Sequence, residues 1–78
     1  MKYQATYVNR MGALMTLTVG DSGFVSLRNS AGVQESLANV PFVAYGLGTA
    51  ERSAVVRTAA RKGISELRRV TGVDWRAA

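Results

Sequence analysis

Residues 9–32 read NRMGALMTLTVGDSGFVSLRNSAG, and this stretch decides the fold. It contains two runs in which apolar and polar residues alternate. Each run is bounded by turn sequences rich in Asn, Gly, Asp and Ser, at residues 9–12, 20–23 and 29–32. Alternating runs between such turns are typical of β-hairpins. The stretch therefore predicts consecutive antiparallel strands in a meander.

Working outward, we expect a first strand over residues 2–9, a second over 13–19 and a third over 24–28. A helix and a short fourth strand are both compatible with residues 33–40, and we favour the strand. The only proline, Pro41, interrupts what precedes it. Residues 42–45 are apolar and are expected to form an extended segment that crosses the sheet. One face of the first two strands is the more apolar and should form the core: Tyr3, Ala5, Tyr7, Ala13, Met15, Leu17 and Val19.

The C-terminal part of the chain predicts a long amphipathic helix over about residues 50–71. Thr49 is the expected N-cap, Glu51 suits the first turn, and Gly72 suits the end. At 100° per residue, one apolar stripe collects Val56, Ala59, Ala60, Gly63, Ile64, Leu67 and Val70. The sequence thus predicts a single α+β domain over residues 1–78. A small antiparallel β-meander of three or four strands (about 2–45) is packed on one face by this helix, and a short tail (72–78) follows.

Composition limits the chemistry of the chain. Its 78 residues include no His and no Cys, and the formal net charge is +5. Residues 48–78 carry seven of the ten basic residues and a net charge of +4. Without His, Cys or a paired set of carboxylates, the sequence predicts no catalytic residue, metal site or cofactor, and hence no enzyme. The loop at 46–49 matches neither GxGxxG nor a Walker motif.

The sequence shows no signal-peptide pattern and no apolar run of roughly 20 residues, so we expect a cytoplasmic protein without a membrane role. A small core and exposed sheet edges leave a homodimer as an open alternative.

The basic residues of the helix are the candidate partner-binding groups. Arg57, Arg61 and Arg68 fall on one flank of the apolar stripe, and Lys62 and Arg69 fall on the other. Arginine forks bind carboxylate or phosphate with two hydrogen bonds, although a solvated helix face is the simpler interpretation. Trp75 either caps the core or anchors an interface. The predicted partner-binding set is Arg57, Arg61, Lys62, Arg68, Arg69, Trp75 and Arg76.

Two functions remain open at this stage. The first is a non-catalytic binding protein that docks on a larger protein assembly and modulates or inhibits it, through an acidic protein surface or a complex bound to nucleic acid. In size and architecture the chain resembles phage or mobile-element accessory proteins, including inhibitors of bacterial defence complexes. The second is a module that binds DNA or RNA directly through the arginine-rich helix face. The order of three strands and a helix resembles the C-terminal part of a double-stranded-RNA-binding domain, although the preceding helix is missing.

Overall fold

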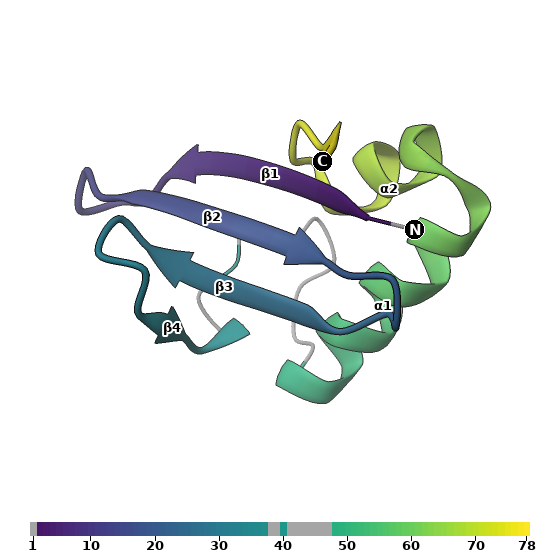
Figure 1. The fold of residues 1–78 in the computed structure, drawn as a ribbon, viewed down its shortest axis with the longest axis horizontal. Helices are drawn as coiled ribbons and strands as arrows, with labels where there is room; N and C mark the ends of the chain where they lie inside the picture. The colour runs from purple at the N-terminus through teal and green to yellow at the C-terminus, as the bar shows by residue number, and fades with distance from the viewer. Residues whose placement is uncertain (1, 38–39, 41–47) are drawn as a thin grey trace.

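The order of the elements confirms the α+β class. The structure is a computed structural model that describes residues 2–37, 40 and 48–78. Strands β1 (Tyr3–Val8), β2 (Leu14–Val19), β3 (Val25–Asn29) and β4 (Gln34–Glu35) precede helices α1 (Thr49–Lys62) and α2 (Ile64–Thr71), and β5 (Arg76–Ala77) follows them. The strands form one antiparallel sheet in the order β4-β3-β2-β1-β5. Both helices lie toward the end of the sheet opposite the β1–β2 turn (Figure 1).

The three predicted turns share one geometry, which explains their sequences. In each turn, the backbone N–H of the closing glycine donates to the carbonyl oxygen of the residue three positions earlier. These glycines, Gly12, Gly23 and Gly32, have φ values of 81°, 85° and 81°, which disfavour a side chain. In two turns an asparagine opens the turn, and its Oδ1 accepts from two backbone N–H groups, at 2.9 Å for Asn9 and 3.0 Å for Asn29.

The strand register separates an inner face from an outer face. Leu17 lies opposite Ala5 on β1 and Leu27 on β3, and all three are buried. Tyr3 and Tyr7 are half-buried against the same core, as the alternation predicted. The other face, which we call the open sheet face, is mostly polar. It carries Gln4, Thr6, Thr16, Thr18, Ser26 and Arg28, with the exposed Val8 and Leu14 opposite each other at one end.

A break at Gly63 divides the predicted helix in two. α1 ends at Lys62 and α2 begins at Ile64, because Gly63 adopts φ 120° and ψ 171°, which interrupts the helical backbone. The expectation of one continuous helix over 50–71 is corrected accordingly. α1 packs on β2 and β3, and α2 adds Leu67 to the core. The N-cap of α1 is Gly48, one residue before the predicted Thr49.

The C-terminal tail returns to the sheet, which the sequence did not predict. Gly72 ends α2 in the left-handed conformation at φ 72°, as expected, and the chain then pairs β5 with β1. Trp75 is fully buried, which confirms that it folds back onto the core. Its Nε1 donates to Thr71 Oγ1 at 2.9 Å, and that hydroxyl donates in turn to the Leu67 carbonyl oxygen at 2.7 Å.

Predictions for residues 41–47, including Pro41 and the extended segment at 42–45, lie outside the described residues. The favoured strand in the 33–40 segment is confirmed as β4. In the part of the chain that is described, no helix has the length and apolar character needed to span a bilayer.

Candidate interaction surface

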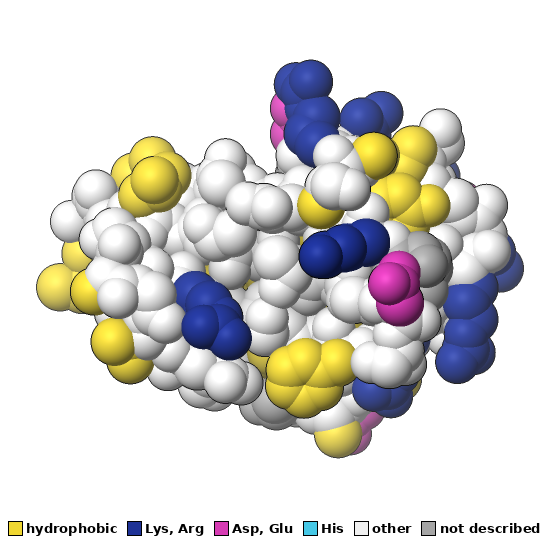
Figure 2. Space-filling model, viewed as in Figure 1, with side chains coloured by type: hydrophobic (Ala, Val, Ile, Leu, Met, Phe, Trp, Pro, Cys, Tyr) yellow, Lys and Arg dark blue, Asp and Glu magenta, His cyan; other side chains and the backbone are white. Residues whose placement is uncertain are grey.

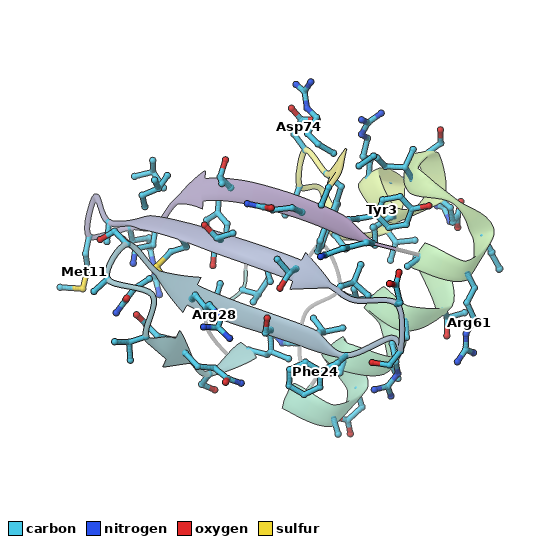
Figure 3. The ribbon with its side chains drawn as sticks, viewed as in Figure 1. Tyr3, Met11, Phe24, Arg28, Arg61 and Asp74 are labelled. Atoms are coloured by element: carbon cyan, nitrogen blue, oxygen red, sulfur yellow. The ribbon has the colours of Figure 1, made fainter. Side chains whose placement is uncertain are left out.

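Three cations on the outer side of α1 form the principal candidate surface. We call Arg57, Arg61 and Lys62 the α1 basic face. Arg61 and Lys62 are exposed, Arg57 is half-buried, and Arg61 projects away from the sheet (Figure 3). Within residues 2–37, 40 and 48–78, none of the three forms an ion pair or a side-chain hydrogen bond. Their charges are therefore available to a partner.

Packing against the β2–β3 turn positions one of these cations. A Cβ atom on Gly23 would lie 3.1 Å from Arg57 Cδ and 3.5 Å from Arg57 Cγ. The aliphatic stem of Arg57 therefore covers the turn, while the guanidinium group extends beyond it. The glycine is needed at this position both for its positive φ and for this close approach. α1 and the turn thus hold the Arg57 stem in place before any partner binds.

The remaining predicted cations interact within the protein. Arg68 Nε donates to the Trp75 carbonyl oxygen at 2.9 Å and lies 3.7 Å from Asp74 Oδ1. Arg76 pairs with Asp74 Oδ2 at 3.0 Å, and Arg69 Nε donates to Glu66 Oε2 at 3.0 Å. The two Arg68 contacts join the tail to α2, whereas the Arg76 pair is internal to the tail and the Arg69 pair is internal to α2.

The predicted set of seven residues therefore divides. Arg57, Arg61 and Lys62 all belong to α1 and have no ion pair or side-chain hydrogen bond among the described residues, with Lys62 on the flank of the groove and Arg57 on the flank of the β2–β3 turn. Arg68 belongs to α2, because the break at Gly63 ends the continuous flank that a straight helix would give it. The prediction that Trp75 anchors a partner at the surface is corrected, because its side chain is fully buried in the core.

Glu66 lies near Lys62, and its charge is already engaged by Arg69. Hydrogen bonds from Arg69 hold the pKa of Glu66 below its ordinary value, and the charges of Arg69 and Lys62 lower that pKa further. The carboxylate pairs with Arg69, not with Lys62, the partner that helical spacing also allowed. Lys62 therefore lies close enough to affect Glu66 without forming an ion pair with it.

A shallow groove of about 300 Å³ separates α1 from α2 next to the α1 basic face. Its lining is mostly small or aliphatic, with one charge of each sign: Ala54, Val55, Thr58, Ala59, Lys62, Glu66 and Val70. The groove joins side chains of two helices that are separated by the bend at Gly63. Sequence reasoning missed it because a straight helix would not bring Val70 and Ala54 to one site. The small residues Ala54 and Thr58 on the outer side of α1 were the available signal.

The basic side chains of the open sheet face are more widely separated than those of the α1 basic face. Figure 2 shows this face mostly white, with separated basic side chains, one apolar group near its lower edge and further apolar groups at its left end and upper right. Basic side chains also line the edge where α1 lies. Phe24, immediately before β3, is 62% exposed. Arg28 lies on the open sheet face and donates to the Gly32 carbonyl oxygen at 3.3 Å (Figure 3). Thr18 and Ser26 hydrogen-bond to each other at 2.6 Å. Of the residues that the structure describes, this face thus offers one exposed ring, that of Phe24, and isolated cations.

The described residues contain no group of three His, Cys, Asp or Glu side chains that could hold a metal ion. Comparison of the chain with protein-family models, with curated proteins and with solved structures gave no match.

Proposed function

We propose that this is a non-catalytic binding protein that docks on an acidic surface of a larger protein assembly through the α1 basic face. The observation that carries the proposal is that the basic residues differ in whether they have interaction partners within the protein. The cations of α2 and the tail contact Glu66, Asp74 or a carbonyl oxygen, whereas Arg57, Arg61 and Lys62 have no such contact among the described residues. A carboxylate on a partner would supply it, with two hydrogen bonds to each arginine fork.

The assembly that we propose is a cytoplasmic complex that handles nucleic acid, of the kind that phage accessory proteins inhibit. The size, architecture and basic charge of the chain support this class. The absence of His and Cys from the sequence is the reason for proposing binding without catalysis. A homodimer would have only the two-residue edge strands β4 and β5 to pair through on the described sheet. We therefore give the docking role to α1.

Direct binding of DNA or RNA is the second candidate, and one observation favours it. Phe24 is exposed immediately after Gly23, against which the Arg57 stem packs. An exposed ring near a guanidinium group is a feature of surfaces that bind single-stranded nucleic acid. Such surfaces usually stack several bases, however. Here the two aromatic side chains of β1 are half-buried, and Trp75 is buried. One exposed ring among the described aromatic residues is weaker support than three cations without an ion pair in the same part of the chain.

The experiment is affinity capture from the native host with the wild-type chain and two charge-reversal variants. Arg61→Glu changes the α1 basic face. Arg10→Glu makes the same change of charge in the exposed β1–β2 turn, at the opposite end of the sheet (Figure 1). We expect a protein partner that is retained after nuclease treatment by wild type and Arg10→Glu, and lost by Arg61→Glu. Loss of all partners after nuclease would instead support nucleic-acid binding, and equal capture by both variants would exclude the α1 basic face.

A further inference from the structure

The groove between α1 and α2 is an apolar recess that lies next to Lys62 of the α1 basic face. Five of the seven lining residues that the structure describes are Ala, Val or Thr. The groove volume of about 300 Å³ is at the lower end of the roughly 300–1,000 Å³ that is usual for small-ligand sites. A groove of this volume is too small for a helix or strand of a partner but can hold one or two apolar side chains. The groove is thus a place for an anchoring side chain of a partner.

The charges at the rim of the groove indicate which charged groups a partner should carry next to its anchoring side chain. Lys62 lines the groove and has no ion pair within the described chain, and Arg61 is the next residue along α1. Glu66, the only acidic residue among the described lining residues, is hydrogen-bonded to Arg69. The unsatisfied charge at the rim is therefore positive. An occupant with carboxylates beside its apolar group would match the rim and leave Glu66 with Arg69.

Nucleic acid fits the same recess poorly. A nucleobase placed in it would leave most of its donor and acceptor edges facing alanine and valine, because Thr58 is the only uncharged hydrogen-bonding side chain among the described lining residues. Phosphates could still contact Arg61 and Lys62, but the recess would add nothing to that contact. Charge and apolar lining together favour a polypeptide.

We infer that the groove binds an acidic peptide segment of a partner protein, with an aliphatic or aromatic side chain in the recess and flanking Asp or Glu side chains on Lys62 and Arg61. This inference rests on the proposed function, because it names the partner chemistry for the same surface. Gly63 is the structural origin of the groove. The bend at this residue places Val70 of α2 opposite Ala54 and Thr58 of α1.

The test is a selection from a displayed library of short random peptides on the immobilised wild-type chain, followed by affinity measurements on the selected peptides. Thr58→Phe fills the groove from an exposed position without changing charge, and Ala54→Phe does so from a second exposed position. Ser65→Phe is the matched control, because Ser65 is exposed on α2 and does not line the groove. The Trp75 emission spectrum verifies that each variant is folded.

We expect the selected peptides to carry an apolar residue flanked by Asp or Glu. Their affinity should fall at least about tenfold for Thr58→Phe and Ala54→Phe and stay within about twofold for Ser65→Phe, because a filled recess excludes the anchor. Selected peptides without acidic residues, peptides that bind both groove variants as well as wild type, or a failure to select any peptide would overturn the inference.

A fourth variant separates this inference from the proposed function. If Arg61→Glu weakens the selected peptides while Thr58→Phe does not, the α1 basic face binds acidic protein and the groove plays no part. If neither variant weakens them, both the groove and the α1 basic face are excluded as the docking site.

Discussion

At the scale of single residues, one buried hydroxyl connects the tail to the core. Thr71 Oγ1 donates to the Leu67 carbonyl oxygen at 2.7 Å and accepts from Trp75 Nε1 at 2.9 Å and from the Val73 backbone N–H at 3.3 Å. The buried indole N–H of Trp75 thereby has a partner. No periodicity in the sequence marks Thr71 for this role, because it depends on where the tail returns.

Replacement of Thr71 by valine tests this role. Thr71→Val keeps the side-chain shape but leaves the Trp75 N–H buried without an acceptor, which costs about 1–3 kcal/mol. We expect the free energy of unfolding to fall by that amount in urea denaturation followed by Trp75 fluorescence. Thr71→Ser, which keeps the hydroxyl, is the control and should lose less. An unchanged midpoint for Thr71→Val would show that the hydroxyl does not matter.

Tyr7 presents the opposite case, a buried hydroxyl without a hydrogen-bond partner in the described structure. Burial, and secondly the charge of Glu35, raise the pKa of Tyr7 above its ordinary value. Tyr7→Phe should leave stability unchanged or increase it by about 1 kcal/mol, because it removes an unsatisfied polar atom. The folded state favours the neutral phenol, so this residue's contribution to stability is complete below about pH 10 and is lost as the pH rises further.

Denaturant midpoints of wild type and Tyr7→Phe at neutral pH and near pH 10.5 measure both effects. The difference in favour of Tyr7→Phe should widen at the higher pH. A loss of more than 1 kcal/mol at neutral pH would mean that the hydroxyl has a partner after all.

The Glu66–Arg69 pair is a third prediction at this scale. Its lowered carboxyl pKa means that the pair stabilises the fold at neutral pH, and that this contribution is lost as the pH falls below about 4.5 through the lowered pKa. Arg69→Gln removes the charged donor and should move the pKa of Glu66 back toward its ordinary value. An NMR titration of the Glu66 side-chain carboxyl carbon measures the pKa directly. An unchanged pKa in the variant would contradict the pairing.

At the scale of elements, the residue types of the turns predicted the structure more accurately than the apolar periodicity of the helix did. The turns at 9–12, 20–23 and 29–32 were predictable because their Asn and Gly residues satisfy a local requirement of the backbone. The helix break was missed because Gly63 also fits an apolar stripe, and periodicity alone does not separate a tolerated glycine from a helix end. β5 was missed because it has only two residues, and its pairing with β1 is a long-range contact.

The element-scale prediction concerns Gly63. An alanine there would meet no atom within 4 Å, so any effect must come from the backbone conformation at φ 120°. That conformation is strained for an L-residue by about 1–3 kcal/mol. We expect Gly63→Ala to lower the free energy of unfolding by that amount, as measured by urea denaturation. The solvent-exposed Ser65→Ala in α2 should change it by less than about 0.5 kcal/mol. Equal stability of wild type and Gly63→Ala would indicate a continuous helix.

At the scale of the whole molecule, some basic side chains form ion pairs within the protein and others remain unpaired at the surface of α1. The sequence identified the cations but not this division, because the pairing of Arg68 and Arg76 with Asp74 requires the tail to be in place. Three of the seven predicted partner-binding residues, Arg57, Arg61 and Lys62, keep their charges unpaired within the described structure. Lys62 lines the groove, and α1 lies at the end of the molecule opposite the β1–β2 turn (Figure 1).

The most direct measurement is NMR mapping of the ¹⁵N-labelled chain as the captured protein partner, or a peptide selected on the wild-type chain, is added. The account predicts that the largest chemical-shift changes fall on residues 54–62 of α1 and on Val70, with small changes on the open sheet face. Changes concentrated at Thr6, Thr16, Thr18 and Ser26, with α1 unaffected, would contradict it.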